Sequence, residues 1–233
     1  MRALVERWET MPQRTSLAVS RYLMRIYFLM SMGIAVSAGT AMLVVDDGVL
    51  RRALFPSTGM SGLVWGVMLA PVLLVITVNA GVRHISARRA RALFFLYAVL
   101  VGLSLGAICY AAIGQSLAPT LLAIAAAFFI LALFSWTSGA DFSPFGAFLT
   151  LGLMALLFLM ATYVAGASQM LDIMLSAAAI VLFAALTAFD LQRLKRLYLD
   201  EDVQTATVGA LTLYLDFVNM FLSLLRFNRR ARR

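Results

Sequence analysis

The chain has 233 residues, of which 63% are apolar and only 13% are charged, and its formal net charge is +8. A soluble globular protein averages roughly 45–50% apolar and about 25% charged residues, so this chain has too few charges to cover a water-soluble globule. We therefore predict an integral membrane protein. The basic residues lie between and after the apolar stretches, which indicates membrane topology and contacts with anionic lipid rather than nucleic-acid binding.

Apolar runs without interior charge follow one another along the chain, and most are long enough for a transmembrane helix. There are seven of them, at about 26–45, 60–82, 92–113, 117–138, 142–166, 173–189 and 206–225. We expect an all-α integral membrane fold, a bundle of seven transmembrane helices over residues 22–226, with a charged tail at 1–21 and a basic tail at 227–233.

Helix-breaking and small residues refine this expectation. Pro71 lies inside the second run and predicts a kink rather than a break. The spacings Gly62–Gly66 and Gly102–Gly106 are each GxxxG, which favours close packing between helices.

Basic residues in short loops predict the orientation of the chain. They are more numerous on the side of the N-terminal tail, so we expect that tail to be cytoplasmic. The arginine-rich C-terminus argues against this orientation unless the last segment is re-entrant, which would place both termini in the cytoplasm. The sequence leaves both topologies open.

Two carboxylates, Asp190 and Asp216, fall within or against apolar helices. A carboxylate at membrane depth costs several kcal/mol, so it usually faces a cavity or a partner. In the last helix Asp216 belongs to a small or polar stripe with spacings of three and four residues, formed with Gly209, Thr212, Asn219 and Ser223. We expect the other helices to surround this helix, with the stripe facing a polar path. A hydrogen-bonded seam between helices would give the same pattern.

Asp190 lies on one helix face with Thr187 and Arg193, a spacing that also fits an ion pair with Arg193. The midpoint between Asp190 and Asp216 is residue 203, beside the charged segment 200–202. Two antiparallel helices joined there would bring both carboxylates to a similar depth. We expect such a pair to share one proton and to titrate as a unit, with a divalent cation competing for it. Two carboxylates without a dense oxygen cage predict weak, passing contact with Ca²⁺.

The same segments carry a family resemblance. "TAFDLQRLK" (187–195) and "GALTLYLDFVNMFLSLLR" (209–226) resemble the C-terminal signature of the Bax inhibitor family, also called transmembrane Bax inhibitor motif proteins. Weaker matches extend to "FLYAVLVGLSL" (95–105) and to the neighbourhoods of Arg25 and Asp141. Near Asp141 the family often has two basic residues, where this chain has Gly139 and Ala140.

The resemblance implies a seven-helix fold with a central last helix, in a bacterial inner membrane, and a pH-sensitive Ca²⁺ leak with an aspartate pair as its sensor. Here that pair would be Asp190 and Asp216. In the family a basic residue that ends the second helix can latch onto the pair, which places His84 there, with Arg83 adjacent. A histidine latch would itself titrate near neutral pH. The two residues equally fit the start of a solvated basic loop.

We expect a passive channel rather than an enzyme, with Ca²⁺ and protons as its partners and no cofactor. The alternative is a membrane protein that modulates another membrane protein, such as a quality-control protease, through its N-terminal tail. An intramembrane aspartyl protease fits less well, because Asp216 lies in "LYLDF" without a GxGD-type surround. A retinal photoreceptor is excluded, since Lys195 is the only lysine and ends a helix.

Overall fold

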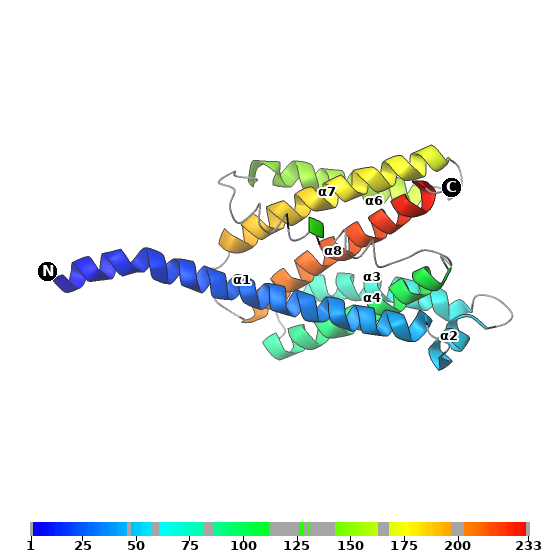
Figure 1. The fold of residues 1–233 in the computed structure, drawn as a ribbon, viewed down its shortest axis with the longest axis horizontal. Coiled ribbons are helices and arrows are strands. Elements are labelled where there is room, and N and C mark those ends of the chain that lie inside the picture. Colours follow the sequence, from blue (N-terminus) through cyan, green and yellow to red (C-terminus); the bar gives the residue numbers. More distant parts are fainter. Residues whose placement is uncertain are drawn as a thin grey trace. The chain divides into compact units, whose positions relative to one another are not determined.

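The computed structural model describes residues 2–45, 48–56, 61–81, 86–111, 126–127, 130, 143–162, 168–196 and 203–231, which are helical apart from short connecting segments. Figure 1 shows the helices as α1 (Arg2–Val45), α2 (Val49–Leu54), α3 (Gly62–Gly81), α4 (Ala87–Ala111), the 3-10 turn η2 (Ser143–Phe145), α6 (Gly146–Thr162), α7 (Gln169–Arg196) and α8 (Val203–Ala231).

Long apolar helices confirm the prediction of a helical membrane protein. Among the described residues four helices are long and apolar enough to cross a membrane, namely Arg21–Val45, Ala87–Tyr110, Gln169–Lys195 and Ala206–Asn228. Helices α3 and α6 cover two further predicted runs, and the run at 117–138 lies almost wholly outside the described residues. Pro71 lies inside α3 without ending it.

The observed helices exceed the apolar runs at several ends. Helix α7 begins at Gln169 because Ser168 caps it, with its Oγ accepting from the Leu171 N–H at 3.4 Å. It continues to Arg196 through Arg193 and Lys195, which are good helix formers. Charged residues that end an apolar run therefore do not end the helix.

Contacts along the chain divide it into two compact units. The first comprises residues 1–113 and 197–211, and the second comprises residues 114–196 and 212–233. Helix α8 contributes to both, because its residues up to 211 belong to the first unit and its remaining residues to the second.

In the first unit α1 and α4 run parallel and pack through the glycines of α4. A Cβ atom placed on Gly102 would overlap Thr40 and lie 2.5 Å from the Ser37 carbonyl oxygen, and one on Gly106 would lie 2.7 Å from the Ala41 carbonyl oxygen. The GxxxG spacing of α4 therefore makes the close contact predicted for it. At Gly62 and Gly66 an added Cβ would meet no atom of the described residues within 4 Å.

Serine hydroxyls join the three long helices of this unit. Ser37 Oγ of α1 donates to the Ala98 carbonyl oxygen of α4 at 2.7 Å, and Ser104 Oγ of α4 donates to the Val67 carbonyl oxygen of α3 at 2.7 Å. Thr40, beside Ser37, hydrogen-bonds within its own helix to the Val36 carbonyl oxygen at 2.9 Å. We call Ser37, Thr40, Gly102, Ser104 and Gly106 the α1–α4 seam.

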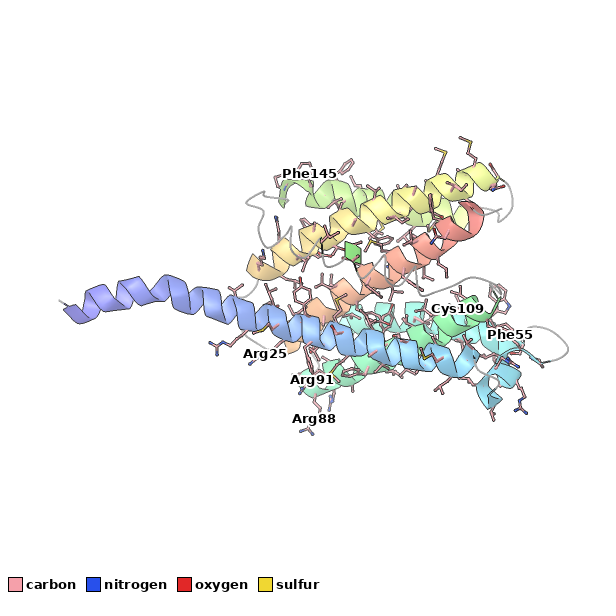
Figure 2. The ribbon with its side chains drawn as sticks, viewed as in Figure 1. Arg25, Phe55, Arg88, Arg91, Cys109 and Phe145 are labelled. Carbon is pink, nitrogen blue, oxygen red and sulfur yellow. The ribbon has the colours of Figure 1, made fainter. Side chains whose placement is uncertain are left out.

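The two ends of this unit differ in chemistry. Figure 2 shows Arg25 of α1 and Arg88 and Arg91 of α4 at one end, and Phe55 and Cys109 at the other. At the second end α2 packs on an apolar cluster, where the Phe55 and Tyr110 rings lie 4.6 Å apart between centres. The candidate spans of α1 and α4 therefore begin at the same end of this unit.

In the second unit α6 and α7 run antiparallel. A Cβ atom on Gly146, at the start of α6, would lie 2.8 Å from the ring of Phe189 near the end of α7, and one on Gly152 would lie 3.2 Å from Leu182. Two glycines thus let α6 approach α7 closely. In Figure 1 the last turns of α8 extend toward the same end of this unit as the first turns of α7.

Candidate functional site

Two carboxyl groups meet in the second unit, at the end of it where α6 begins. Asp190 lies near the end of α7, and Asp216 lies on α8 with only 6% of its surface exposed. The two side chains hydrogen-bond to each other. A carboxylate has no proton to donate, so this bond requires one of the two groups to be protonated. The structure thus brings together the two residues that the sequence predicted would share a site, and we call them the aspartate pair.

Thr187 joins the aspartate pair from the preceding turn of α7. Its side chain is fully buried, and its Oγ1 donates to the Phe183 carbonyl oxygen at 2.7 Å while also hydrogen-bonding to Asp216. A hydroxyl has one proton and two acceptor positions. That proton can serve only one of these two bonds at a time, so Thr187 links Asp216 to the backbone of α7.

One oxygen of Asp216 has no such partner. Its Oδ2 is buried without a hydrogen-bond partner among the described residues. An unsatisfied buried oxygen of this kind costs about 1–3 kcal/mol, and it is available to a proton or a cation that reaches the pair.

Arg193 lies on the other side of Asp190. It is exposed, one turn further along α7, and its charge interacts with the Asp190 carboxyl. Asp190 therefore interacts with Arg193, as its spacing predicted, and also belongs to the aspartate pair. Because Arg193 is exposed, solvent weakens this charge–charge interaction.

The predicted stripe on α8 contains residues of differing burial. Gly209 and Ser223 are buried, and Thr212 and Asn219 are partly buried. Ser223 Oγ donates to the Asn219 carbonyl oxygen at 2.7 Å, so this hydroxyl is satisfied inside its own helix. The role of the stripe in an ion path stays a prediction.

The remaining predictions concern metal ligands and the latch. The described residues contain no group of three or more His, Cys, Asp or Glu side chains that could hold a metal ion. His84 and Arg83 lie outside the described residues.

Two polar residues of α7 were not recognised as site candidates from the sequence. Asp172, which the sequence places at a loop–helix border, lies in the first turn of α7 with 4% of its surface exposed. Ser176, four residues later, is fully buried. Their spacing from each other and from Thr187 and Asp190 puts all four on one helix face, which is the signal that could have identified them.

Comparison with known proteins extends the resemblance over the whole membrane region. The family described as "Inhibitor of apoptosis-promoting Bax1" matches residues 19–233, a range that includes the aspartate pair. An uncharacterized protein of Borreliella burgdorferi is 30% identical over 224 residues, which are 94% of this chain and 95% of that protein.

Two further relatives come from other bacteria. The inner membrane protein YbhL of Escherichia coli K12 is 32% identical over 218 residues, which cover 90% of this chain and 92% of that protein. An uncharacterized protein of Deinococcus radiodurans is also 32% identical over 218 residues, covering 91% of this chain and 92% of that protein. Each of these matches covers almost the full length of both aligned proteins.

Proposed function

Because this chain belongs to the Bax inhibitor family, we propose that it forms a pH-sensitive, passive leak path for Ca²⁺ across the membrane, with Asp190 and Asp216 as the sensor. The observation that carries the proposal is the hydrogen bond between two carboxyl groups of the membrane-spanning helices α7 and α8. That bond exists only while the pair holds a proton, so a change in pH changes both its charge and its geometry.

The chemistry of the pair suits a gate. With one shared proton the two helices are tied together and the pair carries a single negative charge. Loss of that proton leaves two carboxylates that repel each other at close range, which favours separation of α7 and α8 near this end. A divalent cation is attracted to the same two carboxylates, and with only two of them it is held weakly enough to leave again.

The proposal includes the seven-span bundle with the last helix central and the N-terminus in the cytoplasm of a bacterium. Three observations support it. An 18-residue window within Ala206–Asn228 of α8 is 61% buried, the largest share among the four candidate spans of the described residues. Arg25, Arg88 and Arg91 lie at one end of α1 and α4 (Figure 2), as expected for the cytoplasmic side. The relative YbhL is described as an inner membrane protein.

The proposed activity is conduction, not catalysis, with Ca²⁺ as the transported ion and no cofactor. The test is Ca²⁺ flux into proteoliposomes between about pH 5.5 and pH 8.5, comparing the wild type with Asp190→Asn and Asp216→Asn. We expect a pH-dependent flux in the wild type and a flux that no longer follows pH in either variant, because an Asn amide can donate to the remaining carboxylate at every pH.

Asp200→Asn, in the charged segment between α7 and α8, is the matched control. It removes one carboxylate that is not a member of the pair, and we expect it to keep the pH dependence. Absence of flux from folded wild-type protein at every pH would remove the leak proposal, and equal effects of all three substitutions would remove the assignment of the sensor.

One observation favours a second candidate, a regulator that binds another membrane protein. Helix α1 begins at Arg2, whereas the candidate span within it begins at Arg21, so the helix continues beyond the apolar segment. Such a helical extension offers a partner a preformed surface. Deletion of residues 1–20 would then abolish the regulatory activity and leave ion flux intact, whereas an unchanged activity would exclude this candidate.

A further inference from the structure

One face of α7 is buried along the whole candidate span. Its members follow each other at intervals of three and four residues, which keeps them on one side of the helix. In chain order they are Asp172, Ser176, Ala179, Phe183 and Thr187, with exposed fractions of 4%, 0%, 0%, 6% and 0%, and then the partly buried Asp190. We call these six residues the α7 face.

Polar groups occupy both ends of the α7 face, and apolar residues occupy its middle. Thr187 and Asp190 are at one end, with the aspartate pair, and Asp172 and Ser176 are at the other. At 1.5 Å per residue the two carboxyl positions are about 27 Å apart along the axis, close to the thickness of about 30 Å of a bilayer's hydrocarbon core. The face therefore carries a carboxyl group near each side of the membrane.

The hydroxyl of Ser176 distinguishes this second end from ordinary helix packing. A serine or threonine inside a helix usually donates to the carbonyl oxygen four residues back, as Thr187 does to Phe183 and Ser223 does to Asn219. Ser176 Oγ is fully buried and has no hydrogen-bond partner among the described residues. A buried hydroxyl without a described partner, one helical turn from a buried carboxyl group, indicates a place for a ligand that contacts both the hydroxyl and the carboxyl oxygens.

We propose that Asp172 and Ser176 form a second, weak station for Ca²⁺, at the opposite end of the α7 face from the aspartate pair. Carboxylate and hydroxyl oxygens are the hard ligands that Ca²⁺ takes, and waters complete its shell. A station with one carboxylate binds loosely, as conduction requires. The inference rests on the proposed leak function. It adds a site that binds the ion at the end of the path opposite the aspartate pair.

The station predicts a specific change in the concentration dependence of Ca²⁺ flux. We expect Asp172→Asn to raise the half-saturating Ca²⁺ concentration about tenfold while the flux still responds to pH through the unchanged aspartate pair. Ser176→Ala, which removes one neutral oxygen, should raise it about two- to threefold.

A structural role for Asp172 has to be separated from ion binding. An acidic residue in the first turn of a helix also stabilises that helix through its dipole, and Asp172 takes part in interactions within the protein. Ser168→Ala is the control, because it removes the cap of the same helix end without removing the charge. We expect it to lower the melting temperature in detergent and to leave the half-saturating concentration unchanged.

The outcomes distinguish this inference from the proposed function. Wild-type flux with an unchanged half-saturating concentration in Asp172→Asn would overturn the station and leave the leak intact. Equal effects of Asp172→Asn and Ser168→Ala on both melting and flux would assign Asp172 to the helix end alone. Absence of flux in the folded wild-type protein would overturn the leak and the station together.

Discussion

Two polar seams run between apolar helices of this protein, and they differ in how completely their polar side chains are hydrogen-bonded. In the α1–α4 seam the hydroxyls of Ser37, Thr40 and Ser104 all donate to backbone carbonyl oxygens, and Gly102 and Gly106 bring the helices into contact. On the α7 face and its aspartate pair, buried oxygens of Ser176 and Asp216 have no hydrogen-bond partner among the described residues.

The difference distinguishes the two seams better than residue type does. Small and polar residues at helical spacing occur in both seams, and both would look alike in a hydropathy plot. A satisfied hydroxyl between helices adds only about 0.6 kcal/mol on average, and its proton is already donated to a backbone carbonyl oxygen. An unsatisfied buried oxygen costs more than that, and that cost would be recovered on binding a proton or a cation.

Tight packing of the α1–α4 seam predicts the largest effect on stability. Gly102→Ala would force a Cβ atom against Thr40 and the backbone of Ser37, so we expect a loss of about 1–3 kcal/mol. Gly66→Ala is the matched control in α3, where an added Cβ meets no described atom within 4 Å. Alanine there should be neutral or stabilising by up to about 1 kcal/mol. Thermal unfolding in detergent measures both, and similar losses in the two variants would contradict the packing.

The aspartate pair predicts how stability depends on pH. In the proposed mechanism the native state holds a proton between the two carboxyls, whereas in the unfolded chain two hydrated carboxyls release their protons at neutral pH. Stability should therefore fall as the pH rises, by about 1.4 kcal/mol per pH unit for each proton that the native state still holds and the unfolded chain has released, and it should level off once the native pair has also lost its proton. In Asp190→Asn the hydrogen bond needs no shared proton, so we expect a flat profile. Melting temperatures across pH measure this, and a parallel decline in the variant would contradict it.

Loss of the Thr187 hydroxyl should have a smaller effect on stability. Thr187→Val keeps the shape of the side chain and removes the hydroxyl that contacts Asp216, so we expect a loss of about 1–2 kcal/mol. Thr150→Val is the control, because Thr150 is exposed and its hydroxyl donates only to the Gly146 carbonyl oxygen of its own helix. That change should stay within about 0.5 kcal/mol. Equal losses would mean that the hydroxyl of Thr187 has no special role beside the pair.

We expect the smallest effects on stability from replacing one serine of each seam. Ser37→Ala removes the bond to the Ala98 carbonyl oxygen and should cost about 0.6 kcal/mol. Ser176→Ala removes a hydroxyl that is bonded to nothing described, so it should be neutral or slightly stabilising. The free energy of unfolding in detergent, measured side by side, checks the order. A larger loss for Ser176→Ala would show that its hydroxyl has a structural partner.

Much of the fold was predictable because hydropathy is a local property. Apolar runs placed six helices, and the midpoint of Asp190 and Asp216 at residue 203 predicted that they would meet, since α8 begins there. The burial of Asp172 was not predictable in the same way. A carboxyl group at the edge of an apolar run is equally compatible with a solvated helix end. Only the tertiary neighbours of the group decide whether it is buried.

The sequence alone determined that the chain is a helical membrane protein of the Bax inhibitor family and that two carboxyl groups belong to its apolar helices. Tertiary structure decided that Gly102 and Gly106 of α4 make close contacts whereas Gly62 and Gly66 of α3 make none with the described residues, that Thr187 reaches Asp216, and that the hydroxyl of Ser176 is left without a described partner. The physical reason is that helical periodicity fixes which residues share a face, whereas the atom opposite each of them depends on the register between helices.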